Sequence, residues 1–132
     1  MLKSRFDDLC WDIGVALEES NPEEVARHGA ITIQGVNIQL RLEETNMEPT
    51  IIGHVDMGIE LNDDALESKR RLMALNLACG SKRHGFYAID PGTGKATMII
   101  HFDASHDLNG QEMATTLVFR AAQAKAAAEL IS

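Results

Sequence analysis

The spacing of apolar residues changes along this chain, and that change limits the folds that the chain can adopt. From residue 2 to residue 17, apolar residues recur every three or four positions, which places them on one face of an amphipathic helix. These residues are Leu2, Phe6, Leu9, Ile13 and Leu17. The pair Asn21-Pro22 then ends the predicted helix, because proline cannot continue the hydrogen-bond ladder. From residue 31 to residue 61 the apolar period is two, which is the period of half-buried strands.

Turns divide this alternating region into three predicted strands. Residues 31–33 alternate in one parity, and residues 36–42 alternate in the other. A two-residue hairpin at Gln34-Gly35 produces such a change, because glycine accepts the positive φ that the turn needs. A second turn is expected from Asn46 to Pro49, and the third strand follows over residues 51–61. The pattern therefore predicts an antiparallel meander with one buried face.

The rest of the chain returns to the helical period twice. A second helix is predicted from about Asp64 to Gly80, and a third begins at Asn109. Two more strands are expected between them, over residues 86–89 and 96–102. The chain is thus predicted to form a single α+β domain, residues 1–132. Three helices pack on a twisted, five-stranded antiparallel sheet in the order α-βββ-α-ββ-α.

Charge and cysteine content limit the partners and the compartment. The 132 residues include 20 Asp and Glu and 12 Lys and Arg, a formal net charge of -8. A compact domain with this charge repels phosphate backbones and anionic lipids, so neither nucleic acid nor a membrane is expected as a partner. Cys10 and Cys79 lack ligand-like spacing and are interpreted as reduced thiols. Because residues 1–8 also lack the apolar region of a signal peptide, a cytoplasmic location is predicted.

One short motif invites a phosphate-loop interpretation, which the neighbouring residues exclude. Gly92-Thr93-Gly94-Lys95 would need a glycine at the position of Ile89 and a Ser or Thr at that of Ala96. The motif also runs into a predicted strand, whereas a phosphate loop opens a helix. It is therefore interpreted as a hairpin turn, and no cofactor is expected.

Histidine and aspartate pairs are the best candidates for a metal or catalytic site. His54 and Asp56 share one face of a predicted strand, as do His101 and Asp103, and His106-Asp107 follows. Polar residues on the outer face of a half-buried sheet are the ordinary case, so no metal is expected. No cysteine or serine lies in a catalytic sequence context, and the chain is not expected to be an enzyme.

The second helix has two apolar stripes, and a helix that rests on one sheet needs only one. One stripe consists of Leu66, Met73 and Leu77, and the other of Leu72, Leu75 and Cys79. We expect the second of these stripes to pack against the same helix of another copy around a twofold axis, which makes the chain a homodimer. The alternative is that the third helix or a loop covers it.

The first helix carries a tryptophan away from its core stripe. Trp11 projects about 180° from Leu2, with Val15 beside it. An exposed indole gives a large contact area at low entropic cost, so these two residues form a candidate binding surface. The alternative is that Glu23 to His28 fold back over Trp11.

The sequence around the second helix resembles a known family. Residues 72–80 read Leu-Met-Ala-Leu-Asn-Leu-Ala-Cys-Gly, and residues 85–95 read Gly-Phe-Tyr-Ala-Ile-Asp-Pro-Gly-Thr-Gly-Lys. A leucine-rich helix with an asparagine, then a strand, an acidic glycine turn and another strand, resembles the class I type III secretion chaperones, the Tir-chaperone family. The order of elements over nearly the whole chain is also similar.

The resemblance implies residues for two surfaces. The family's dimer interface falls here on Leu72, Leu75, Asn76, Cys79, Phe86 and Ile89. Its effector-contact surfaces fall on the first helix, with Phe6, Trp11 and Val15, and on Val36, Ile38 and Leu40. Although the residue pattern assigns several of these to the core, the family uses apolar surfaces on helix and sheet to hold an extended segment, sometimes as an added strand.

The resemblance implies a dimeric chaperone of the bacterial cytoplasm, without catalysis or nucleotide. Such a chaperone binds the N-terminal segment of a type III secreted effector and keeps it secretion-competent. The alternative is a regulatory or adaptor module of the same fold that binds a folded protein. A small enzyme that uses the His-Asp strand faces is a third, more remote reading.

Overall fold

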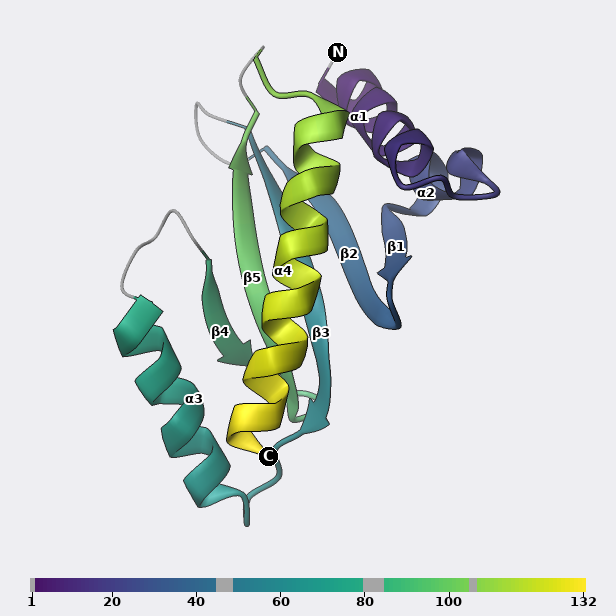
Figure 1. The fold of residues 1–132 in the computed structure, drawn as a ribbon. Helices are drawn as coiled ribbons and strands as arrows, with labels where there is room; N and C mark the ends of the chain where they lie inside the picture. Colours follow the sequence, from purple (N-terminus) through teal and green to yellow (C-terminus); the bar gives the residue numbers. More distant parts are fainter. Residues whose placement is uncertain (1, 45–48, 80–84, 105–106) are drawn as a thin grey trace.

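A computed structural model describes residues 2–44, 49–79, 85–104 and 107–132 of the chain (Figure 1). Its helices are α1 (Leu2–Ala16), α2 (Pro22–His28), α3 (Leu66–Cys79) and α4 (Gly110–Ile131). Its strands are β1 (Ala30–Ile33), β2 (Val36–Glu43), β3 (Thr50–Glu60), β4 (Phe86–Ile89) and β5 (Lys95–Asp103). The predicted α+β class and the five-stranded antiparallel sheet are confirmed. The predicted turn at residues 46–49 lies outside the described residues, except for Pro49.

The strands form one sheet in the order β1-β2-β3-β5-β4. The predicted hairpin joins β1 to β2, with Ile33 opposite Val36 and positive φ at both Gln34 and Gly35. Strand β3 lies between β2 and β5, where Val55 pairs with both Ile38 and Met98. The register of β3 against β5 shifts between Asp56 and Glu60. Because the helix α3 separates β3 from β4, the chain reaches the far edge of the sheet before it returns through β5.

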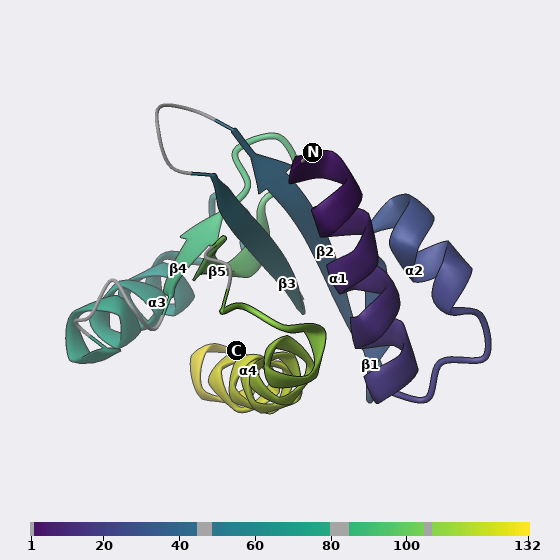
Figure 2. The ribbon, with the colours of Figure 1, turned by 90° about the horizontal axis from the view of Figure 1, so that it is seen from above.

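Helices α1 and α4 cover one face of this sheet (Figures 1 and 2). Alternate residues of β2, β3 and β5 point into this inner face, and the opposite residues form an outer face over which no described helix lies. The predicted stripe of α4 supplies the other side of the core: Leu117 and Ala124 are fully buried, and Val55 faces them from β3. The small alanines of α4 allow the helix to approach the sheet closely.

A short helix that the sequence interpretation missed follows α1. Asn21-Pro22 was read only as a helix end, but α1 already ends at Ala16 and Pro22 begins α2. Proline is favoured in the first turn of a helix, where its missing N–H costs nothing. Two glutamates in the first turn and Arg27 and His28 in the last turn complement the helix dipole. The described residues therefore contain four helices, one more than predicted.

Gly29 joins α2 to the sheet under tight steric limits, which gives a test of the fold. Its φ is +65°, and a Cβ atom there would lie 2.5 Å from the carbonyl oxygen of Leu40. We expect Gly29→Ala to lower the free energy of unfolding by about 2–4 kcal/mol, since it adds a clash to a strained backbone. In the control Gly35→Ala, φ is +82° but no atom lies within 4 Å, so about 1 kcal/mol is expected. Urea denaturation measures both losses, and equal losses would contradict the proposed contact.

Candidate partner-binding surfaces

Trp11 and Val15 form an exposed apolar surface on α1. The side chain of Trp11 is 46% exposed and that of Val15 is 54% exposed, whereas Ile13, between them in sequence, is fully buried. Helix α2 packs against the flank of α1 instead of covering Trp11, with Pro22 beside Gly14. Residues 23–28 thus do not fold over the indole, and the alternative in which they cover it is wrong.

The structure reverses the predicted roles of the two stripes on α3. Leu72 is 3% exposed, and Leu75 packs against the core of its own chain. The other stripe is the exposed one, with Leu66, Met73 and Leu77 exposed by 57%, 70% and 85%. Within its own chain Leu72 is buried and Leu75 is half-buried, on the side of α3 that packs against β4 and α4.

Asn76 fixes the rotation of α3 and is a contact within the chain. Its Nδ2 donates a hydrogen bond to the carbonyl oxygen of Tyr87 at 2.8 Å, and its Oδ1 accepts one from the N–H of Tyr87 at 2.6 Å. Tyr87 belongs to β4, the strand at one edge of the sheet. Asn76 thus binds both polar backbone groups of an edge residue, and its predicted place in a dimer interface stays a prediction.

The remaining predicted interface residues differ in exposure. Phe86 is 44% exposed on the outer face of β4, and Ile89 is half-buried against the core. Cys79 is the last residue of α3, and its side chain lies outside the described part of the structure. Of the predicted set, Phe86 is the residue that a partner can reach most readily. Sequence reasoning identified the stripe of Leu66, Met73 and Leu77 on α3 but did not name these exposed residues as interface candidates.

Four of the predicted effector-contact residues lie in the core. Phe6, Val36, Ile38 and Leu40 are 7%, 8%, 2% and 2% exposed. Phe6 lies on the buried face of α1, and the three strand residues lie on the inner face of β2, toward the helices. Their assignment as a binding surface is therefore wrong, because the alternation that the sequence shows uses them to build the domain.

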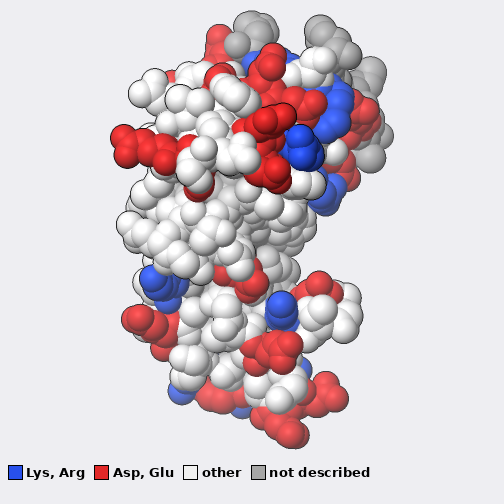
Figure 3. All heavy atoms as spheres, turned by 90° about the vertical axis from the view of Figure 1, so that its right-hand side faces the viewer, with Lys and Arg blue, Asp and Glu red and all other residues white. Residues whose placement is uncertain are grey.

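Strand β1 forms the other edge of the sheet. In a two-residue hairpin the residues that flank the turn bond to each other, so the N–H and C=O of Thr32 point away from β2. None of the residues from Ala30 to Ile33 is charged. Figure 3 shows this side of the molecule: charged side chains gather toward its two ends, and an uncharged belt crosses it between them. The belt lies at the height of β1 in Figure 1.

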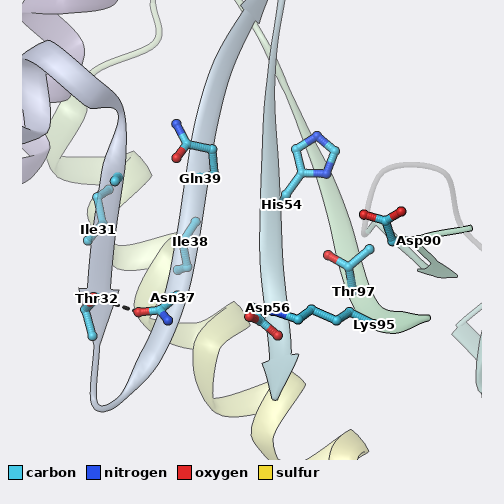
Figure 4. A pocket seen from close by; sticks show the side chains of 11 residues that line it. Ile31, Thr32, Asn37, Ile38, Gln39, His54, Asp56, Asp90, Lys95 and Thr97 are labelled. Atoms are coloured by element: carbon cyan, nitrogen blue, oxygen red, sulfur yellow. Dashed lines mark hydrogen bonds between the residues drawn. The ribbon is translucent and has the colours of Figure 1, made fainter. Parts of the chain in front are cut away.

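The outer face of the sheet contains a polar hollow of about 510 Å³ (Figure 4). Gln39, His54, Asp56 and Thr97 project into it from three adjacent strands, and Lys95 lies beside Asp56. Within the described residues, no three His, Cys, Asp or Glu side chains gather closely enough to hold a metal ion. His106 lies outside those residues. The hollow therefore offers both hydrogen-bond donors and hydrogen-bond acceptors, and no concentration of charge of one sign.

His54 is held in its neutral form by its surroundings. The Nε of Arg41 donates a hydrogen bond to His54 Nε2 at 3.2 Å, which requires an unprotonated acceptor. Burial, followed by the positive charge of Arg41 and by His101, lowers the pKa of His54. On the same face, the rings of His101 and Phe86 lie 6.0 Å apart, centre to centre. The outer face is thus a mixed aromatic and polar surface.

The buried thiol of Cys10 is poorly suited to nucleophilic chemistry. Burial raises its pKa to about 12, with a further increase from Asp7 and a small opposing effect of Lys3. The reactive form of cysteine is the thiolate, which such a pKa suppresses. Cys10 is fully buried among the apolar residues of α1 and the sheet, where it acts as a small apolar side chain.

Stability should depend on pH through His54. Because the pKa of His54 is lowered in the folded state, protonation of His54 favours the unfolded chain. The contribution of neutral His54 to the free energy of unfolding is therefore fully present above pH 6.5, and it is lost as the pH falls through the folded pKa. We expect His54→Gln to lose less thermal stability than the parent between pH 8 and pH 5. His28→Gln, at the end of α2, removes the same kind of group elsewhere and serves as the control. Identical pH profiles for parent and His54→Gln, measured by differential scanning calorimetry, would contradict this assignment.

Comparison with known proteins identifies the fold. No protein family model matches the chain, and no curated protein matches it. Among solved structures, a chain in the crystal structure of the ExsC–ExsE complex is similar, with a TM-score of 0.71 and 16% sequence identity. The match covers 98% of this chain and 96% of that one. At this identity the likeness shows the fold alone: this chain and that chain share their architecture, and membership of the Tir-chaperone family is not shown.

Proposed function

We propose that this chain is a homodimeric, cytoplasmic chaperone of type III secretion that binds the N-terminal segment of a secreted effector and keeps it secretion-competent. The observation that carries the proposal is the exposed pair Trp11 and Val15 on a fold shared, over nearly its whole length, with a chain of the ExsC–ExsE complex. ExsC is found with a protein partner there, and we extend partner binding to this chain. None of the described helices is long and apolar enough to cross a membrane.

The exposed surfaces suit an extended client. The edge strand β1 offers the outward N–H and C=O of Thr32 to an added strand, and main-chain bonds of this kind bind a segment without reading its sequence. Trp11 and Val15 offer apolar contacts on α1, and these contacts select among the side chains of the client segment. Ordering a flexible segment costs conformational entropy, and apolar burial of this kind offsets it. The net charge of -8 keeps a protein with such surfaces soluble.

The proposed dimer uses the exposed stripe of α3. Leu66, Met73 and Leu77 lie on the side of α3 that its own chain leaves uncovered, and Phe86 is exposed on the adjacent strand β4. Leucine and methionine at 85% and 70% exposure are unusual for a stable monomer surface when they line one face of a helix. A second copy around a twofold axis would cover them with the same residues.

Removal of the indole tests client binding. The probes are overlapping 25-residue peptides from the N-termini of secreted proteins encoded in the same genome, and calorimetry measures the affinity. We expect Trp11→Ala to weaken the best peptide at least about 30-fold, which corresponds to about 2 kcal/mol for a central aromatic contact. Val118→Ala, on a 39% exposed residue of α4 that belongs to none of the proposed surfaces, is the control and should change the affinity little. Equal affinities for parent and Trp11→Ala would remove Trp11 from the proposed site.

A charge on the α3 stripe tests the dimer. We expect Leu77→Asp and Met73→Asp to sediment as folded monomers, since two copies would bury opposed carboxylates at the twofold axis. Leu130→Asp introduces the same group on an exposed residue of α4 and should leave the dimer intact. If the parent chain is monomeric at 100 µM or the α3 variants remain dimeric in analytical ultracentrifugation, the α3 interface is wrong.

A second candidate function is a regulatory or adaptor module that binds a folded protein. The outer face of the sheet favours it, because Phe86, His101 and the adjoining hollow form a broad mixed surface with no described helix over it. An adaptor of this kind would bind an intact folded domain and ignore short peptides. The peptide series above therefore separates the two functions, since only a chaperone holds a contiguous unfolded segment.

A further inference from the structure

Arg120 is a buried cation without a counter-charge in the part of the chain that the structure describes. Its side chain on α4 is 8% exposed. Nη1 donates a hydrogen bond to Oε1 of Gln123 at 2.6 Å, whereas Nε is buried and has no hydrogen-bond partner. No described Asp or Glu forms an ion pair with the guanidinium. A buried charge with an unsatisfied donor lowers stability, so its presence needs an explanation.

An exposed apolar surface adjoins this guanidinium. The ring of Phe119 lies 5.7 Å from Arg120 Cζ, and the Phe119 side chain is 63% exposed. Leu130 is 66% exposed three turns farther along α4, on the same side of the helix as Phe119. This side of α4 points away from the sheet, and Figures 1 and 2 show no described element over it. A largely solvated side chain such as that of Phe119 can change rotamer without disturbing the core.

We propose that this face of α4 binds a partner segment that places one carboxylate on Arg120 between apolar side chains. Charge complementarity indicates that the bound group is a carboxylate. The Nε and Nη2 donors of arginine match the two oxygens of a carboxylate, and such paired bonds are strong where water is excluded. Phe119 and Leu130 give the flanking residues of that segment an apolar surface. The site lies on α4, apart from Trp11 and from the α3 stripe, and does not depend on the proposed chaperone function.

The Nε–H resonance of Arg120 in a ¹H–¹⁵N spectrum of the full chain reports occupation of the site directly. Arg120→Lys identifies this signal by removing it. The probe is a capped peptide of sequence Ala-Leu-Glu-Leu-Ala, and its matched control has Gln in place of Glu. We expect the Glu peptide to shift the resonance saturably and the Gln peptide to bind at least about tenfold more weakly, because it lacks the charge-assisted bonds.

Three outcomes would overturn the proposal. In the first, the resonance does not respond to the Glu peptide at millimolar concentration. In the second, both peptides shift it equally, which would make the surface merely apolar. In the third, the resonance shifts as the protein concentration rises without peptide, which would show that a second copy occupies this face. Binding of an effector peptide through Trp11 is measured separately, so either result can fail without the other.

A stability measurement distinguishes a binding arginine from a structural one. Arg120→Met keeps the length of the side chain and removes the unpaired charge, so we expect the thermal midpoint to rise by about 3–6 °C. Lys125→Met is the control: Lys125 is exposed and donates to the carbonyl of Gln34, and its loss should change the midpoint little. A lower midpoint for Arg120→Met would mean that Arg120 holds the fold together, and the proposal would fall.

Discussion

The contact between α4 and the inner face of the sheet is the interaction on which the rest of the domain depends. Leu117 and Ala124 on the helix and Val55 on the central strand are all fully buried. Each methylene group buried in this way contributes about 0.8 kcal/mol, and no other described helix contacts β3 as extensively. Because α1 and α4 cover this one face, the opposite face and the β1 edge of the sheet remain available, whereas α3 contacts the β4 edge. The exposed large apolar residues of the chain are therefore not part of this buried core.

Much of this architecture follows from the sequence, because it rests on local periodicity. Alternation predicts the strands, and the change of parity at Gln34-Gly35 predicts the hairpin that the backbone angles confirm. The short α2 was missed because Pro22 is read equally well as the end of one helix or the start of another. Its buried Val25 is a single apolar residue, too little for a periodic signal.

The candidate surfaces were harder to predict, because they depend on how elements are rotated against each other. The sequence shows that α3 has two apolar stripes but not which of them faces inward. In the structure, the inward orientation of the Leu72 stripe goes with the two hydrogen bonds between Asn76 and Tyr87. A contact between residues eleven positions apart has no local signature in the sequence. Trp11 was identified correctly as lying opposite the core stripe, since both belong to one helix. Arg120 escaped notice, because only the tertiary packing shows that it is buried.

Asn76 has a consequence for how the protein behaves in a crowded cell. A sheet with two open edges can pair with a strand of another molecule on each side, and repeated pairing of this kind builds fibres. By occupying the polar groups of Tyr87, Asn76 leaves β1 as the end at which another strand can add. A protomer with one receptive edge pairs edge to edge with at most one other protomer, so the sheet by itself cannot build a fibre.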